Sequence, residues 1–464
     1  MSTYDPLTFK ALTFHDAVPA FRNGGDTPRA YLERCLETIT QRDDVVKAYV
    51  SLNEDSARAA ADASAARYKD DRPLSAIDGL PISIKDLLET KDMPTQMGCE
   101  AYAGNFPKND NAAVRALREA GAVVLGKTVT AELGGTHPGL TTNPFNATRT
   151  PGGSSSGSAA AVAAAMVPAA IGTQVGGSII RPAAYCGNVA LKPTQGGINR
   201  GERQATSMST HGIHANCIED MWQSAIEIAR RAGGDRGCLG LFGPDTPPIA
   251  VKPNRLIVLE TAGWAILDDA SKIAFEGLLE NLQQAGVTLL RRKDNVLVEK
   301  LEQAIVEAPA ICGDITRWEN QWAQRNLVDQ KGEFVSDRLK AGLALAEAMS
   351  PDDYRAALLA RKTAQRCHDA VGQLADAAIT LSCPGPAPLW PGDIQGQPLV
   401  ARPTGDAIFN TPTSMLFAPC VTMPLLAVGG MPLGVQIVGQ QHQDAGMTAI
   451  ARWMLDEVAP VVIG

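Results

Sequence analysis

The sequence predicts an α/β protein, because segments of helical and strand-like character alternate along the chain. Ala112 to Ala120 has a helical composition, Gly121 interrupts it, and residues 122–125 form an apolar strand-like run. Residues 80–84 form another short apolar run, and residues 433–438 alternate in the manner of a strand. These observations predict helices packed on a sheet.

Two helices and a strand are expected in the first part of the chain. Thr27 and Pro28 provide a cap and a first-turn proline, and apolar residues then recur on one helical face up to Ile39. Residues 57–68 are alanine-rich, which favours a second helix. The run 80–84 predicts a buried strand that ends just before Lys85. Residues 143–158 are rich in Pro, Gly, Ser, Thr and Asn, and we expect them to form a loop that leads into an apolar helix over 159–166.

The middle of the chain, about 230–400, lacks comparable glycine-rich signals. Helices are expected at 268–285 and 353–372, with a strand at 256–259. We interpret this region as a divergent helical elaboration of one domain spanning 1–464, which shapes a substrate pocket. A strand at 433–438 and a helix at 445–455 close the main core.

Composition narrows the function classes. Hydrophobic residues make up 45% and charged residues 20%, the usage of an ordinary globular protein rather than a disordered or fibrous one. The formal net charge is -8 and no dense Lys/Arg run occurs, which argues against a nucleic-acid partner. The nine cysteines are scattered without a C-x-x-C pair, which favours reduced thiols and a cytoplasmic protein.

The sequence does not predict export or membrane insertion. Asp5 and Lys10 fall where a secretion signal needs an uninterrupted apolar stretch. The longest apolar run, residues 159–171, is shorter than the ~20 residues that cross a bilayer and contains Pro168.

Three segments contain residue types that acyl transfer needs: 79–86, 152–158 and 172–182. Ser178 follows two glycines, and a glycine turn can present a hydroxyl while its backbone N–H groups face a developing oxyanion. Gly-Gly-Ser is also a common composition for a plain turn. The local sequence leaves both readings of Ser178 open.

Ser154 and Lys85 are equally ambiguous when each is considered alone. Ser154 lies in a Gly/Ser run that resembles a flexible linker, although the apolar helix expected after it favours an ordered loop. Lys85 ends an apolar run, where burial would lower its pKa toward neutrality as a lysine general base requires. The alternative for Lys85 is a structural ion pair with Asp86 or another acid.

Together, the three segments resemble the amidase signature family. Residues 152–158 (Gly-Gly-Ser-Ser-Ser-Gly-Ser), 176–187 (Gly-Gly-Ser-Ile-Ile-Arg-Pro-Ala-Ala-Tyr-Cys-Gly) and 191–194 (Leu-Lys-Pro-Thr) match its long glycine/serine-rich signature. Lys85 stands at the family's upstream lysine position. The resemblance covers about 25–200 and returns at 418–424 and 430–439. It implies a central mixed β-sheet covered by helices on both faces.

The resemblance also implies a mechanism. Ser178 becomes the nucleophile, Ser154 the relay serine after a cis peptide bond, and Lys85 the base, so that an amide or a carbamate (urethane) is hydrolysed through an acyl-enzyme. The resemblance implies no metal and no organic cofactor. The implied binding partner is a small-molecule amide or carbamate substrate, and a homodimer is possible under this reading. The implied oxyanion hole comprises the backbone N–H groups of Val175, Gly176, Gly177 and Ser178. Residues expected to bind substrate are Met97, Gly98, Gly153, Ser155 and Tyr185.

Two positions depart from the family pattern. Gln174 stands where many members have an acid, and Arg181 comes one residue later than in the more familiar Ser-Ile-Arg order. Neither change touches the three catalytic side chains. They favour a stand-alone amidase, such as an aryl acylamidase or a urethanase, over the glutaminyl-tRNA amidotransferase subunit.

Other motifs suggest competing functions. Residues 121–128 satisfy the G-x-x-x-x-G-K-[ST] phosphate-loop pattern, but the strand expected at 122–125 lies inside it, where a loop is required. Residues 153–157 fit the G-x-S-x-G nucleophile elbow, which would make Ser155 the nucleophile of an α/β-hydrolase-type esterase. Such an enzyme also needs a histidine, and its elbow follows an apolar strand. No apolar strand precedes residue 153. His211 and His214 form H-x-x-H, which we interpret as ordinary loop histidines rather than metal ligands. A non-catalytic binding protein that retains the fold is a further alternative.

Overall fold

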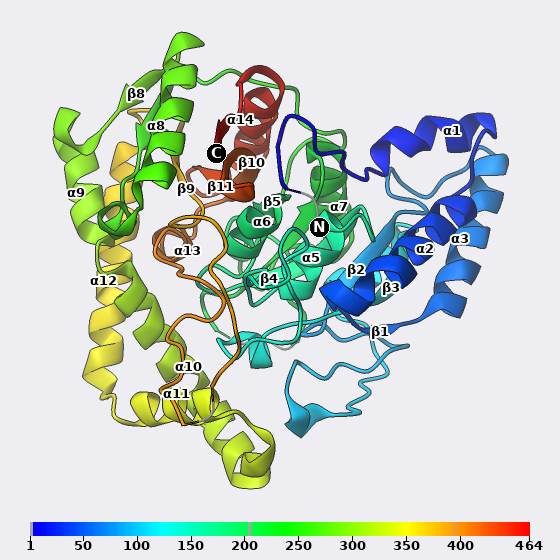
Figure 1. Ribbon diagram of the computed structural model, residues 1–464, viewed down its shortest axis with the longest axis horizontal. Helices are drawn as coiled ribbons and strands as arrows, with labels where there is room; N and C mark the ends of the chain where they lie inside the picture. Colours follow the sequence, from blue (N-terminus) through cyan, green and yellow to red (C-terminus); the bar gives the residue numbers. More distant parts are fainter. Residues whose placement is uncertain (1–2, 203–205, 395) are drawn as a thin grey trace.

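The computed structural model describes residues 3–202, 206–394 and 396–464. Within these ranges, twelve strands form one mixed sheet in the order β1-β3-β2-β4-β6-β5-β10-β11-β9-β7-β8, and β12 pairs with β10 (Figure 1). The strands are β1 (Tyr49–Leu52), β2 (Pro81–Lys85), β3 (Val123–Thr128), β4 (Ala169–Gln174), β5 (Val189–Lys192), β6 (Thr210–Ala215), β7 (Arg255–Val258), β8 (Thr288–Leu290), β9 (Ala377–Leu381), β10 (Cys420–Val428), β11 (Met431–Val438) and β12 (Val461–Ile463).

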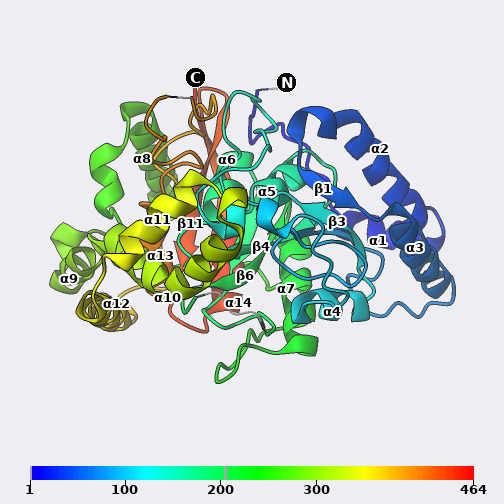
Figure 2. The same cartoon turned by 90° about the horizontal axis from the view of Figure 1, so that it is seen from below.

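The α-helices lie on both sides of this sheet (Figures 1 and 2). They are α1 (Val18–Asn23), α2 (Pro28–Val46), α3 (Glu54–Lys69), α4 (Ala112–Glu119), α5 (Ser156–Ala163), α6 (Ile180–Cys186), α7 (Ile218–Ala232), α8 (Asp269–Gln284), α9 (Val296–Ile305), α10 (Ala308–Lys331), α11 (Asp337–Glu347), α12 (Pro351–Val371), α13 (Thr411–Met415) and α14 (Asp444–Glu457). The expected mixed sheet with helices on both faces is confirmed.

Strand alternation explains how both faces are covered. In β2, Ile82 and Ile84 belong to the apolar cluster that contains Trp222 of α7. In β3, Val123 belongs to another cluster, which contains Ala160 of α5. Successive side chains of a strand point to opposite faces of the sheet. Ser83 and Lys85 therefore face the side of the sheet on which α5 lies, opposite to Ile82 and Ile84. This alternation directs Lys85 toward the start of α5.

The expected helices and strands are present, with shifted ends. β3 continues three residues past the expected strand end, to Thr128, and α5 begins at Ser156 rather than at 159. Glycine at 157 lets the first turn of α5 pass close to Ala48, because a Cβ there would lie only 2.3 Å from the Ala48 carbonyl oxygen. The apolar run 159–171 divides at Pro168 into the end of α5 and the strand β4, which the sequence analysis did not separate.

Residues 230–400 contribute more than helices. Helices α9 to α12 do form a layer beside the sheet, at the left of Figure 1. However, β7, β8 and β9 from the same region extend the main sheet, with Ile379 of β9 opposite Ile437 of β11. Because three of its strands are part of the main sheet, this region cannot be described as a helical elaboration alone.

Across the described ranges, we find no helix with the length and apolar character needed to span a membrane.

Candidate active site

Lys85 is the last residue of β2, and its side chain is completely buried. Its Nζ donates to Ser154 Oγ at 2.7 Å and to Ser155 Oγ at 2.9 Å. On the β4 side it donates to Thr173 Oγ1 at 2.8 Å and to the Thr173 carbonyl oxygen at 3.3 Å. All of these acceptors are neutral oxygens, so the ammonium form has no ion-pair partner among them.

Burial holds the pKa of Lys85 well below its ordinary value, and the nearby charge of Arg181 lowers this pKa further. The neighbouring acid does not compensate. Asp86 instead pairs with Lys127, at 2.9 Å from Nζ to Oδ1, and also accepts from the Gln96 N–H. The ion pair considered from the sequence between Lys85 and Asp86 is therefore not formed, and Lys85 is suited to be uncharged.

Ser154 lies in the loop before α5, directly after a cis peptide bond between Gly153 and Ser154. Its carbonyl oxygen accepts from the N–H of Ala131, and the Gly153 carbonyl accepts from Arg181 Nη2 at 2.7 Å. A larger residue at Gly153 would force a local shift, since a Cβ there would lie 2.8 Å from Thr404 Cγ2. The loop is therefore ordered by specific contacts and is not a flexible linker.

Ser178 lies in the turn between β4 and α6. It is only partly buried, whereas Lys85 and Ser154 are almost fully covered. The Ser178 carbonyl oxygen accepts from the N–H of Ser155 at 3.3 Å, which joins the turn to the loop that carries Ser154. The structure thus brings the three segments together and leaves Ser178 as their accessible serine.

Gln174 organises the turn that precedes Ser178. Its Oε1 accepts from the N–H groups of Ile179 at 2.8 Å and Ile180 at 3.0 Å, and its Nε2 donates to Ser414 Oγ at 2.9 Å. Gln174 Oε1 thus accepts from the N–H groups of the two residues that follow Ser178, and not from the N–H groups of residues 175–178. The sequence analysis noted Gln174 only as a departure from the family pattern, and the structure shows what this side chain contacts.

The residues expected to bind substrate have different surroundings. Gly98 is exposed, whereas Met97 is buried next to it and has a positive φ of 58°. Gly153 and Tyr185 are buried, and the Tyr185 ring lies where a Cβ on Gly405 would be. Ser155 is buried within the hydrogen bonds of Lys85. The assignment of these five residues to substrate binding stays a prediction.

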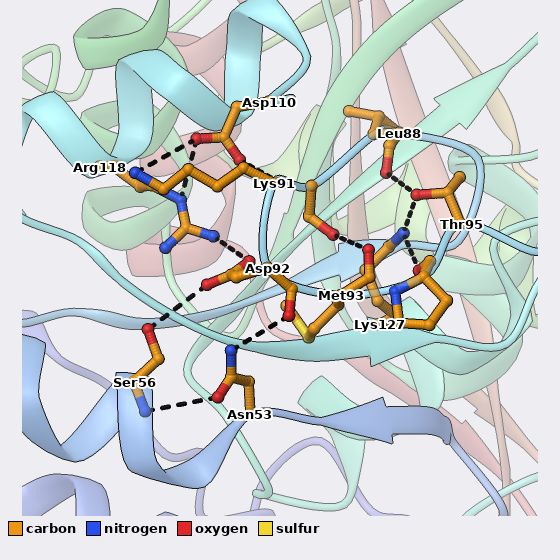
Figure 3. A network of polar contacts seen from close by, with 12 residues as sticks. Asn53, Ser56, Leu88, Lys91, Asp92, Met93, Thr95, Asp110, Arg118 and Lys127 are labelled. Carbon is orange, nitrogen blue, oxygen red and sulfur yellow. Dashed lines mark hydrogen bonds and ion pairs between the residues drawn. The ribbon is translucent and has the colours of Figure 1, made fainter. Parts of the chain in front are cut away.

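The phosphate-loop pattern at 121–128 does not form a loop. Residues from Val123 onward form β3, and Lys127 is buried on this strand. Figure 3 shows Lys127 beside Thr95, whose Oγ1 accepts from Nζ at 2.7 Å, and Nζ also donates to the Pro94 carbonyl oxygen. A lysine whose hydrogen bonds are taken up in this way inside a sheet is not placed to hold a phosphate.

The nucleophile-elbow pattern also lacks its structural context. Residues 143–154 form loop rather than a strand, and the Ser155 hydroxyl donates to the Thr173 carbonyl while accepting from Lys85 and from the Thr173 N–H. These contacts occupy Ser155 Oγ, which argues against an attacking role.

His211 and His214 are not loop residues, as the sequence analysis assumed, but belong to strand β6. Their spacing of three places them on opposite faces of the sheet, which separates the two imidazoles. Burial lowers the pKa of each to about 3, so both are neutral at ordinary pH. In the described part of the chain, no three His, Cys, Asp or Glu side chains form a group able to hold a metal ion.

Two contact residues were missed from the sequence. Thr173 accepts from Lys85 through its side chain and its carbonyl oxygen, and its place in the segment 172–182 is the one signal that could have drawn attention to it. Thr404 accepts from Arg181 through its carbonyl oxygen and Oγ1. It lies more than two hundred residues away in a loop, and no local pattern marks it.

A buried lysine bonded to two serines, beside a partly accessible serine on a tight turn, defines a serine–lysine type of site on a mixed α/β fold. Comparison with known proteins agrees with this class. A family model described as Amidase matches residues 30–447, and the chain belongs to this family, that of the amidase signature.

Similar proteins cover nearly the whole chain. The A subunit of the glutamyl-tRNA(Gln) amidotransferase of Chloroflexus aurantiacus is 30% identical over 483 residues, which cover 95% of each chain. A crystal structure of an amidase superimposes with a TM-score of 0.83 and 26% identity, covering 96% of this chain and 100% of the other. A bacterial aryl acylamidase of the amidase signature family superimposes with a TM-score of 0.79 at 20% identity, covering 96% of each chain, and shows the shared fold.

Proposed function

We propose that this protein hydrolyses the carbon–nitrogen bond of a small amide, with a carbamate as a related substrate, through an acyl-enzyme on Ser178. The observation that supports this most directly is the 2.7 Å hydrogen bond between Lys85 Nζ and Ser154 Oγ, in a buried site where no acid of the described residues pairs with the lysine. Membership of the amidase family supports amide hydrolysis as the class of reaction. The family does not specify the substrate, which the experiment below is designed to identify.

In the proposed mechanism, neutral Lys85 is the base. It accepts the proton of Ser178 through Ser154 Oγ while Ser178 Oγ attacks the carbonyl carbon. The backbone N–H groups of residues 175–178 stabilise the negative charge on the carbonyl oxygen. Ser154 then passes a proton to the departing nitrogen, and the C–N bond breaks. Water repeats the same steps on the acyl-enzyme, which releases the acid and restores Ser178.

A second candidate is suggested by the 30% identity to one component of an amidotransferase. Such a protein would draw its amide from a particular donor and work with partner subunits. The neutral Gln174 and the displaced Arg181 favour a stand-alone hydrolase instead. Hydrolysis of simple aryl amides by the isolated chain would support the first candidate, whereas activity only in the presence of added partner subunits would support the second.

The test is release of amine from a panel of aryl amides, alkyl amides, carbamates and esters. We expect Ser178→Ala to abolish turnover, and Ser154→Ala and Lys85→Ala to reduce kcat by at least about a hundredfold, the scale of lost acid–base catalysis. His211→Ala and His368→Ala should keep measurable turnover, since no imidazole takes part in the proposed relay. Full activity of Ser178→Ala would contradict the proposal.

A further inference from the structure

Arg181 carries a buried charge that the proposed mechanism does not use. It is the third residue after Ser178, on α6, and only 6% of it is exposed. Its Nε donates to the Thr404 carbonyl oxygen at 2.9 Å, and its Nη2 donates to the Gly153 carbonyl oxygen at 2.7 Å and to Thr404 Oγ1 at 3.2 Å. All three acceptors are neutral, and an arginine keeps its proton in proteins. The positive charge is therefore not paired by these contacts.

The guanidinium spans the two catalytic loops. One of its acceptors, the Gly153 carbonyl, belongs to the residue that precedes Ser154. On the other side, a Cβ on Gly177 would lie 2.7 Å from Arg181 Nη1, so the guanidinium lies directly against the turn that carries Ser178. A change at Arg181 would therefore reach the relay serine and the nucleophile together.

Within the described ranges, Arg181 is the charged side chain whose positive charge lowers the pKa of Lys85. From β6, His211 and His214 interact with Lys85 electrostatically, but burial keeps both imidazoles neutral. From the end of β2, Asp86 is paired with Lys127. From the α5 and β4 sides, Lys85 meets the neutral side chains of Ser154, Ser155 and Thr173. A fixed cation in this buried region makes a second cation at Lys85 unfavourable.

We propose that Arg181 is a positioning residue that fixes Ser154 through the Gly153 carbonyl. Its positive charge, which its three hydrogen-bond acceptors do not neutralise, keeps Lys85 in the neutral form that acts as base. This inference rests on the proposed function of Lys85. The later position of this arginine, one residue beyond the more familiar order, is then part of how this chain builds its site.

The test follows the reactivity of Ser178 directly, independent of any substrate. An alkyl fluorophosphonate forms a bond from phosphorus to Ser178 Oγ and loses fluoride, while the serine proton passes to the base. Its labelling rate, read by intact-protein mass spectrometry from pH 5 to 10, should rise with pH as Lys85 loses its proton. The sign follows because the protonated lysine below its pKa cannot accept another proton.

Arg181→Gln removes the charge and keeps a donor for the Gly153 carbonyl. Because a nearby cation lowers the pKa of Lys85, its loss should raise that pKa and move the labelling curve to higher pH by about one unit. Arg181→Lys keeps the charge and loses the planar fork. Its curve should stay at the wild-type pH and reach a plateau about tenfold lower. Arg42→Met is the matched control, because Arg42 Nη1 also donates to a backbone carbonyl, that of Ala164, away from Lys85.

Each outcome decides one point. If Arg181→Gln and Arg181→Lys show the wild-type pH dependence and differ only in plateau, the charge has no role and the inference is overturned. If Arg181→Gln does not fold by circular dichroism, Arg181→Met provides the same charge comparison. If Ser178→Ala is labelled as fast as the wild type, the proposed function fails instead, which keeps the two failures distinct.

Discussion

At the scale of single residues, Gln174 shows how one side chain can hold the turn that carries Ser178. Its amide oxygen takes the N–H groups of Ile179 and Ile180, and its amide nitrogen reaches Ser414, which itself donates to the Gly176 carbonyl oxygen at 3.4 Å. The Gln174 amide is thereby connected to both ends of the turn, directly at Ile179 and Ile180 and through Ser414 at Gly176. An acid at this position would accept the same two N–H groups but would lose the bond donated to Ser414.

Gln174→Ala tests this role. We expect kcat to fall about tenfold to a hundredfold with little change in KM, because the misplaced turn weakens the stabilisation of the transition state more than ground-state binding. Steady-state kinetics on the best substrate of the panel provides the measurement. Ser414→Ala removes only the outer bond and should cost less. An unchanged kcat in Gln174→Ala would show that the turn holds its shape without this side chain.

At the scale of elements, strand β3 contains a buried ion pair where a nucleotide site was considered. Lys127 is on the strand, and Asp86 follows β2 on the parallel neighbour. Burial raises the pKa of Asp86 and lowers that of Lys127, while their mutual attraction opposes both shifts. Each group therefore needs the other to remain charged in the interior.

Lys127→Met should destabilise the protein by about 3–5 kcal/mol, because it leaves a buried carboxylate without its partner. The measurement is the midpoint of urea unfolding. Lys91→Met is the matched control, since Lys91 is exposed and its Nζ lies 4.0 Å from Asp110, a contact expected to contribute little. Magnesium ATP should not raise the midpoint of the wild type, and a clear rise would return the nucleotide hypothesis to consideration.

At the scale of the whole molecule, the sheet joins distant parts of the chain into one core. Ile379 of β9 is completely buried in the apolar cluster that includes residues of β2, β5 and β11. Strand β9 belongs to the region 230–400, which the sequence analysis interpreted as an elaboration. If this region shares the main core, damage to it should unfold the entire protein.

Ile379→Asp tests this connection by placing a charge in the shared core. We expect loss of the cooperative thermal transition, or insoluble protein, as measured by circular dichroism and differential scanning fluorimetry. Ile273→Asp is the control from the same region, because Ile273 on α8 is 60% exposed and should tolerate the change. A variant Ile379→Asp in which the remaining chain still melts at the wild-type temperature would show that 230–400 folds separately.

The sequence by itself determined the class of fold and most elements near the site. Periodicity and glycine positions fixed β2, α4, β3, β11 and α14, because these signals are local and need no information about neighbours. The joint occurrence of Lys85, Ser154 and Ser178 in three matched segments was also sufficient to predict the family. Each of these residues alone had an ordinary structural explanation.

Only the tertiary structure decided what each polar group contacts. The sequence could not choose between Asp86 and the serines as partners of Lys85. Asp86 is 1 position away and Ser154 and Ser155 are 69 and 70 positions away, so they compete only once the sheet has formed. It also could not show that Thr404 meets Arg181 or that β9 joins β11, since both depend on contacts between remote segments. The burial of Lys85 and the charge of Arg181 both lower the pKa of this lysine, and both effects exist only in the folded chain.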